Sequence, residues 1–401
     1  MIRSVKLSTK FTNTTKQKQY KLFLNEYRNV VAKFIDILWE EKIITLLLSK
    51  KITQQINSTW LSARAVQCAG KQASSIVRGT QKKQKQRMYK LRQLQKENKD
   101  TIKLQRTIDK ANISKPNISE INPILDSRFF KIDSNNPTIF DIWINLTSLG
   151  NKMKLVIPLK QTRIYNKWNT QGQIKNSIRL LSDKIELVFE IPDSLKSSGD
   201  TIGLDIGVTN TYYSSDKQHS KEDIHSWSLD KITKRLSQRK KGSKGFERTQ
   251  QHRTNYINWS LNQLNLTNVK QVNIENIKKL RYKSKYSRLL SHWTYTDIFD
   301  KIRQYCEEQN VSVQIINPIY TSQRCSVCGW TQKKNRKGKS FSCLKCKFTC
   351  DSDWNAALNI SFDLPEITWN DRQKHLNVQG FYWNSNGFDQ ECIVPDSPVK
   401  T

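Results

Sequence analysis

The stretch TIGLDIGVTNTYYSSD, residues 201–216, is the most informative segment for the fold of the C-terminal half. Apolar residues alternate along it from Ile202 to Val208, which is typical of a strand that packs one face in a core. The opposite face carries Asp205 between two glycines. Neighbours without side chains would let a metal ion and a phosphate approach this carboxylate closely. An ordinary edge-strand aspartate explains the motif almost as well, so it needs support from elsewhere in the chain.

Two further acidic motifs give that support. In VKQVNIENIKKL, residues 269–280, Glu275 ends an apolar strand, and in CDSDWNAALNI, residues 350–360, Asp353 begins a helix. The alanines that follow Asp353 predict that this helix packs tightly on a sheet, near the strand ends. Asp351 or Asp353 could instead be only an N-cap. Three converging carboxylates are the ligands that two-metal phosphodiester hydrolysis needs, and all three motifs together are more specific than any one.

Four cysteines lie between the second and third acidic motifs. They form two C-x-x-C pairs, in CSVCGW and CLKCKF: Cys325, Cys328, Cys343 and Cys346. This spacing predicts one Zn²⁺ held by four thiolates, with no open position and therefore a structural role. A thioredoxin-like redox pair is the alternative. It is disfavoured because two pairs occur and no βαβ pattern surrounds them.

The charge balance predicts a polyanionic partner. The 401 residues include 68 Lys and Arg against 35 Asp and Glu, a formal net charge of +33. An excess spread over most of the chain favours nucleic-acid binding over a surface that is basic only for solubility. No apolar run is long enough to span a bilayer, and the N-terminus lacks an apolar signal core. We therefore expect no membrane partner and an intracellular protein.

The N-terminal half alternates between helical and extended patterns. A weak strand pattern covers residues 2–11, and helical patterns cover residues 17–48, 57–77 and 81–112. The last of these is strongly basic at its start, so we expect it to follow a phosphate backbone, although a solvated exposed helix is the simpler alternative. Short alternating runs between residues 127 and 191 predict an antiparallel sheet or small barrel.

The order of the motifs resembles the transposon-associated TnpB nucleases and their descendants, the miniature type V CRISPR effectors. The resemblance rests on LDIG, IEN-x-K-x-L, HWTYTDIF from His292, NPIYTSQRCSVCG from Asn317, and D-x-NAA-x-NI. It is close from about Thr201 to Ile360, whereas the N-terminal half matches only in pattern. The departure is CDSD before the last motif, where the family more often has an Arg-Asp or Ala-Asp pair.

The resemblance implies an α+β multidomain fold. An N-terminal wedge-like β-barrel would comprise residues 1–15 and 120–195, with a helical recognition lobe inserted at 16–119. A RuvC-like domain of RNase H fold would comprise residues 201–320 and 347–362, with the zinc module inserted at 321–346. From its composition, we expect the tail at 363–401 to be loosely attached or disordered.

The resemblance also implies an RNA-guided, Mg²⁺-dependent DNA endonuclease. Asp205, Glu275 and Asp353 would hold two catalytic Mg²⁺ ions at a single RuvC site. A guide RNA and target double-stranded DNA would be the partners, with cleavage next to a short target-adjacent motif, by a monomer or an RNA-assembled dimer. A transposon-associated nuclease is our first hypothesis. A miniature type V CRISPR effector, a guided non-cleaving repressor and an unguided zinc-ribbon protein are the alternatives. Cytoplasm with the bacterial nucleoid is the expected location, or the nucleus for a eukaryotic or viral source.

Overall fold

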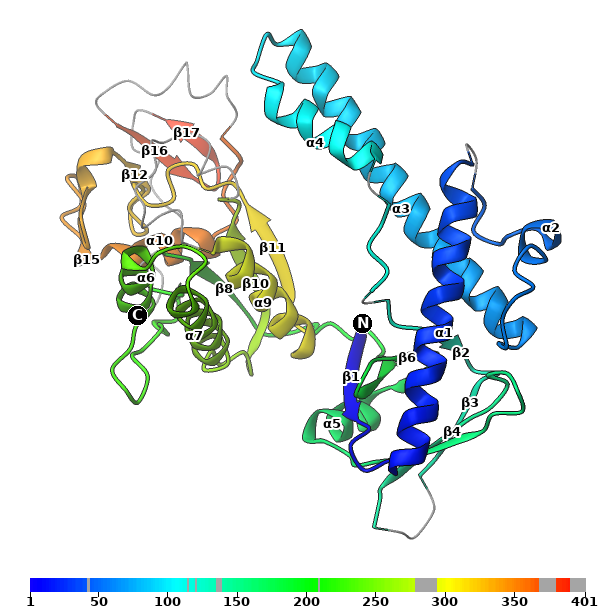
Figure 1. Cartoon of the computed structure of the whole chain (residues 1–401). Helices are drawn as coiled ribbons and strands as arrows, with labels where there is room; N and C mark the ends of the chain where they lie inside the picture. The colour runs from blue at the N-terminus through cyan, green and yellow to red at the C-terminus, as the bar shows by residue number, and fades with distance from the viewer. Residues whose placement is uncertain are drawn as a thin grey trace. The chain divides into compact units, whose positions relative to one another are not determined.

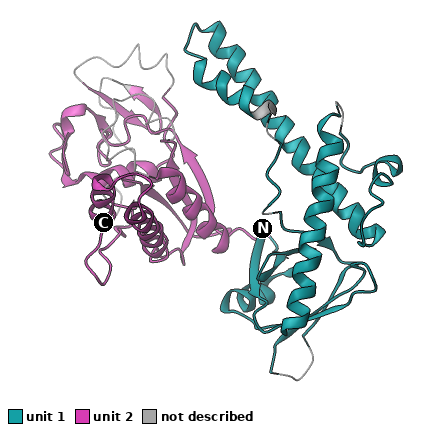
Figure 2. Ribbon diagram, viewed as in Figure 1, with its two compact units in different colours: residues 1–192 teal, residues 193–401 magenta. Residues whose placement is uncertain are grey.

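A computed structural model shows two compact units, residues 1–192 and 193–401 (Figure 1 and Figure 2). The structure describes residues 1–41, 44–113, 115–119, 121–134, 139–207, 210–277, 294–367 and 380–389. Within these ranges, no helix is long and apolar enough to cross a membrane.

Two antiparallel sheets form the base of the N-terminal unit. The first has the order β1-β7-β6-β2, from β1 (Ile2–Ser8), β7 (Lys184–Glu190), β6 (Gln173–Leu180) and β2 (Ile124–Asp126). The second has the order β3-β4-β5, from β3 (Phe130–Asp133), β4 (Ile142–Leu146) and β5 (Leu155–Leu159). A short helix, α5 (Arg163–Gln171), connects β5 to β6. Strand β1 pairs with β7, from Ile2 opposite Glu190 to Ser8 opposite Lys184. The start of the chain therefore completes a sheet whose other strands come much later in the sequence.

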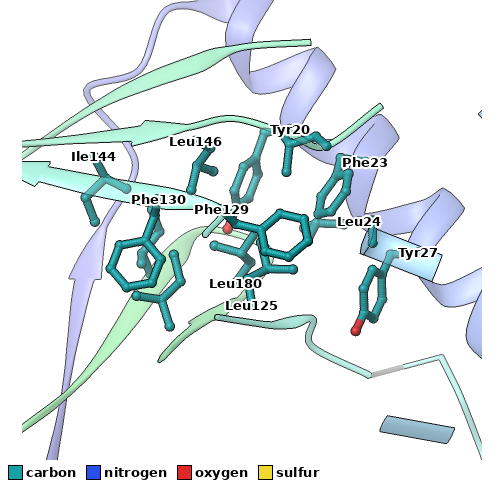
Figure 3. Close-up of a cluster of buried hydrophobic side chains, with 14 of the residues drawn as sticks. Tyr20, Phe23, Leu24, Tyr27, Leu125, Phe129, Phe130, Ile144, Leu146 and Leu180 are labelled. Atoms are coloured by element: carbon teal, nitrogen blue, oxygen red, sulfur yellow. The ribbon is translucent and has the colours of Figure 1, made fainter. Parts of the chain in front are cut away.

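Four helices lie between β1 and β2 in the sequence: α1 (Thr14–Trp39), α2 (Lys50–Thr53), α3 (Ala63–Lys96) and α4 (Ile102–Ile113). Buried aromatics of α1, including Phe23 and Tyr27, pack in one core with Phe129 and Leu125 beside the sheets (Figure 3). The sequence predicted a break near residue 77, but α3 continues to Lys96. Its buried residues lie mostly in its first half, and the polar second half is rich in Lys, Gln and Arg, which are good helix formers.

The C-terminal unit is built on a four-stranded sheet with the order β11-β10-β8-β9. The strands β8 (Asp200–Asp205), β10 (Val269–Glu275) and β11 (Ser312–Ile316) are parallel, and β9 (Tyr213–Ser214) is antiparallel to β8. Parallel neighbours need crossover connections. Helices α6 (Leu229–Gln238) and α7 (Lys244–Leu261) lie between β9 and β10 in the chain, and α9 (Tyr295–Glu308) lies between β10 and β11. Helix α10 (Ser352–Ser361) packs on β8 through Ala357.

The cysteine segment is made of short strands: β12 (Trp330–Thr331), β13 (Arg336–Lys337), β14 (Ser340–Ser342) and β15 (Thr349–Asp351), with a 3₁₀ turn, η2 (Lys333–Asn335). A C-terminal hairpin, β16 (Phe381–Asn384) and β17 (Gly387–Asp389), adds to β12. The expectation of a loosely attached tail is therefore wrong for residues 381–389. Phe381 and Trp383 are buried there with Ile367, and this apolar cluster supplies the attachment. The tail segments 368–379 and 390–401 lie outside the described residues.

Candidate carboxylate site and metal centre

Asp205 is the last residue of β8, and its place depends on a close approach of helix α10. A Cβ at Gly203 would lie 2.2 Å from the carbonyl oxygen of Ala357 and 2.5 Å from the amide nitrogen of Ser361. The interpretation that this glycine makes room for an ion and a phosphate is therefore wrong. Gly203 instead lets the helix of the third acidic motif pack against the strand that carries Asp205. Val208, expected on the apolar face of this strand, lies outside the described residues.

Glu275 ends the neighbouring parallel strand, so its side chain emerges at the same edge of the sheet as Asp205. Its carboxylate accepts a hydrogen bond from the hydroxyl of Thr321. Its backbone carbonyl accepts another from the hydroxyl of Tyr295, at 2.8 Å. Both partners fall in the motifs YTSQ and HWTYTDIF, but sequence analysis assigned neither a role. Residues 278–293, which contain the end of the IEN motif and the start of HWTYTDIF, lie outside the described residues.

Asp353 is the second residue of α10, and its carboxylate is not the helix cap. Asp351 is the N-cap, and its side chain accepts hydrogen bonds from the amides of Asp353 (2.8 Å) and Trp354 (3.2 Å). The buried carboxylate of Asp353 instead contacts the Lys339 ammonium and, at 3.3 Å, the Arg336 guanidinium. Of the two acidic residues that could have been caps, only Asp353 is therefore available to the site.

Burial and a neighbouring carboxylate raise the pKa values of Asp205 and Glu275. Burial, and next the negative charge of Asp353, raise the pKa of Asp205 to about 7. Burial, and next the charge of Asp205, raise the pKa of Glu275 to about 8, although its hydrogen bond from Thr321 opposes the shift. The guanidinium of Arg336 lowers both pKa values. Asp205 is therefore close enough to interact with both Asp353 and Glu275. Among the described residues, the four cysteines are the one group of three or more His, Cys, Asp or Glu side chains gathered closely enough to hold a metal ion, so the three carboxylates are not gathered in this way.

The four predicted cysteines do converge. Their sulfur atoms all lie within 4.8 Å of one another, and the pairs Cys325–Cys346 and Cys328–Cys343 are each 3.6 Å apart. A tetrahedron with Zn–S bonds of about 2.3 Å has S···S edges of about 3.8 Å. The group therefore fits a tetrahedral metal such as zinc, and its four thiols fill every position.

Two asparagines of α10 connect the carboxylates to the cysteine segment. Asn355 accepts a hydrogen bond from the amide of Ser326 at 3.1 Å and donates to the carbonyl of Arg324 at 2.8 Å. Asn359, one turn further on the same helix face, donates to the carbonyl of Thr321 at 2.8 Å. The helix that carries Asp353 thus fixes the loop whose Thr321 contacts Glu275. The signal that sequence analysis missed is the spacing of the two asparagines by four residues.

Arg324 extends this network to the C-terminal hairpin. Its buried guanidinium donates to the carbonyl of Trp383 at 2.6 Å and to the side-chain oxygen of Asn359 at 2.7 Å. Arg324, which directly precedes Cys325, therefore connects the C-terminal hairpin and helix α10 through hydrogen bonds from one buried guanidinium.

Comparison with known proteins gives a consistent family resemblance. Residues 295–360 match the family model described as the Cas12f1-like TNB domain. Over 82 residues the chain is 45% identical to the CRISPR-associated endodeoxyribonuclease Cas12f1 of Sulfoacidibacillus thermotolerans, an alignment that covers 20% of this chain and 19% of that protein. Over 95 residues it is 29% identical to the TnpB-like protein aq_aa05 of Aquifex aeolicus, covering 22% and 31%. The alignment with the Cas12f1 of Sulfoacidibacillus thermotolerans thus spans about a fifth of the length of that relative.

A solved structure shows the same kind of fold over most of the chain. The Cas12f1 chain in a complex with sgRNA and target DNA matches with a TM-score of 0.52 and 16% identity, over 88% of this chain and 83% of that chain. The chain therefore has a mixed α/β multidomain fold similar to that of Cas12f. The predicted resemblance to TnpB proteins and miniature type V effectors is confirmed.

Proposed function

We propose that this chain is an RNA-guided DNA endonuclease of the miniature type V or TnpB kind, which cuts double-stranded DNA next to a short target-adjacent motif. One observation carries the proposal. Asp205, Glu275 and Asp353, from three separate elements, face one region at the carboxyl ends of two parallel strands, where burial and a neighbouring carboxylate raise the pKa values of Asp205 and Glu275. Carboxylates whose pKa values are shifted by burial and by each other are typical of functional sites.

The same sheet supports the domain assignment that we propose. Parallel strands β8, β10 and β11, with α10 against β8, support a RuvC-like RNase H domain at residues 201–320 and 347–362. The cysteine segment at 321–346 is then a zinc module inserted before the last helix. In the N-terminal unit, the two antiparallel sheets would form the wedge, and the helices within residues 16–119 would form the recognition lobe.

The donor set fits divalent magnesium. Three carboxylates offer hard oxygen ligands, which Mg²⁺ prefers. Two bound Mg²⁺ ions would activate water and stabilise the leaving oxygen of the phosphodiester.

The chain's own residues prepare the site. Thr321 orients the Glu275 carboxylate, and Asn359 holds the Thr321 loop in place. The cations of Arg336 and Lys339 lie beside Asp353, where they offset the repulsion among the carboxylates and can attract a DNA phosphate.

The test is cleavage by carboxylate variants in complex with a defined guide RNA. Asp205→Ala should abolish cutting of complementary DNA in Mg²⁺ while guide-dependent target binding persists, because the change removes a metal ligand and no phosphate contact. Glu275→Gln and Asp353→Asn should behave alike. Cleavage by Asp205→Ala at the wild-type rate would refute the assignment, and a wild type that binds but never cuts would support the guided repressor instead.

A further inference from the structure

Strand β9 places an aromatic pair beside Asp205. Tyr213 is directly opposite Asp205 in the antiparallel pairing of β8 and β9, so the two side chains lie on the same face of the sheet. The Tyr213 ring stacks on the imidazole of His219, with ring centroids 5.2 Å apart and planes 20° from parallel. A flat stacked surface therefore adjoins the carboxylate site.

This pair is not part of the hydrophobic core. The preceding residue, Tyr212, is 1% exposed and packs with the apolar side chains of the sheet. Tyr213 points to the other face and is half-buried, and His219 is exposed. The imidazole is therefore accessible to a ligand.

The turn that carries the pair is held in place. A backbone bridge joins Tyr213 to His219, and the amide of Ser214 donates to the carbonyl of Gln218 at 2.8 Å. The indole N–H of Trp354, the residue after Asp353, donates to the carbonyl of Ser215 at 3.0 Å. The stack is therefore fixed to the helix of the third carboxylate, and little ordering is needed when a ligand binds.

The same turn carries a cation. Lys217 lies at the tip of the same turn, and its ammonium is 4.8 Å from the centroid of the Trp354 indole. Stacked aromatic rings beside a lysine are the combination with which proteins hold single-stranded nucleic acid: the rings accept a base and the cation a phosphate.

We propose that the Tyr213–His219 stack holds an unpaired nucleobase of the DNA strand next to the scissile phosphate, with Lys217 on a flanking phosphate. The inference rests on the proposed nuclease function and adds the residues that position its substrate. A base fixed there limits the motion of the neighbouring phosphodiester at the carboxylates, so the stack acts on the cleavage step more than on target binding, which guide pairing dominates.

The experiment combines His219 variants with abasic DNA. Single-turnover cleavage by the guide-bound protein is measured on targets with one abasic nucleotide at successive positions around the cut. His219→Ala should slow cutting of intact DNA about tenfold, with unchanged target binding, whereas His219→Phe should keep most of the rate because it keeps a ring. At one position, an abasic nucleotide should slow cutting by the wild type as much as His219→Ala slows cutting of intact DNA. The same abasic nucleotide should not slow the His219→Ala variant any further. The exposed His225, changed to Ala, is the matched control and should leave the rate unchanged.

Two outcomes would overturn the inference. If the rate losses from His219→Ala and from the abasic nucleotide add at every position, His219 contacts no base. If His219→Ala cuts at the wild-type rate, the stack does not contribute to cleavage. If the wild type does not cut at all, the proposed function fails separately. The stack is then tested by fluorescence of bound single-stranded DNA that carries 2-aminopurine, and equal quenching by wild type and His219→Ala would reject it.

Discussion

Asp205 and Glu275 end adjacent parallel strands, and each is half-buried next to another carboxylate that disfavours its charge. Both residues are predictable from the sequence because a carboxylate directly after an apolar strand is a local pattern. Their mutual repulsion is not local, since it arises only where β8, β10 and α10 meet. The same is true of Thr321, whose hydrogen bond to Glu275 depends on a loop fixed by α10.

The raised pKa values predict how stability depends on pH in metal-free protein. The folded state binds protons more tightly than the unfolded state, because the pKa of Asp205 rises from 3.8 to about 7 and that of Glu275 from 4.5 to about 8. The resulting stabilisation is fully present below the unfolded pKa values near 4 and is lost as pH rises through 7 to 8. Asp205→Asn should therefore raise Tm relative to wild type, by little at pH 4 and by about 2–4 °C or more at pH 8.

Thermal unfolding in EDTA across this pH range measures the effect. Mg²⁺ at pH 8 should stabilise the wild type, since a bound cation offsets the repulsion among the carboxylates. The Tm difference between Asp205→Asn and the wild type should therefore become smaller. The exposed Asp300, changed to Asn, is the control and should give a difference that does not grow with pH. A Tm difference for Asp205→Asn that stays constant from pH 4 to pH 8 would contradict the assigned burial of this carboxylate.

At the scale of elements, the cysteine group organises strands too short to be stable alone. Cys325→Ser should reduce the zinc content from about one ion per chain and lower Tm, because structural zinc contributes on the order of 10 kcal/mol to small metal modules at neutral pH. Metal analysis by mass spectrometry and thermal unfolding check the two effects. Cys350→Ser is the matched control, since Cys350 is half-buried nearby but outside the four-thiol group, and it should keep the zinc. Full zinc content in the Cys325 variant would refute the ligand set.

The C-terminal hairpin gives a second prediction at this scale. Deletion of residues 380–401 removes Trp383 and Asn384, which accept hydrogen bonds from the buried guanidinium of Arg324. A hydrogen bond to a charged group contributes about 1.5–3 kcal/mol. Arg324 keeps its hydrogen bond to Asn359 but loses those to the hairpin, so the C-terminal unit should unfold at a lower temperature and cleavage should fall. A deletion from residue 390 keeps the hairpin and is the comparison. Equal Tm and activity for both truncations would show that the hairpin contributes nothing.

Elements defined by local periodicity were predictable, whereas those defined by distant contacts were not. The strand at Asp205, the helix at Asp353 and the four-cysteine group follow from patterns within about 20 residues. The hairpin at 381–389 was missed because its buried aromatics are isolated in a polar tail, and they become a core only against Ile367. Gly203 was misinterpreted for the same reason, since the backbone that approaches it comes from α10.

At the scale of the whole molecule, the net charge of +33 predicts that the protein binds a polyanion. The charge favours nucleic acid in general, and the family resemblance specifies a guide RNA. We therefore expect the protein to purify with RNA and its DNA cutting to require that RNA. Stripping with high salt and nuclease should abolish cleavage, because many phosphate contacts weaken by about a thousandfold or more over a few-fold rise in salt.

The decisive step is to add back one defined guide to the stripped protein. Cutting should return only on DNA complementary to that guide and only next to a fixed short flanking sequence, found by randomising the bases beside the target. A scrambled RNA of equal length is the control: it carries the same phosphate charge, so it should bind the basic surface without restoring cleavage. Equal cutting by stripped protein without any RNA would mean that the carboxylate site works as a free nuclease, and the positive charge would then serve to bind DNA directly.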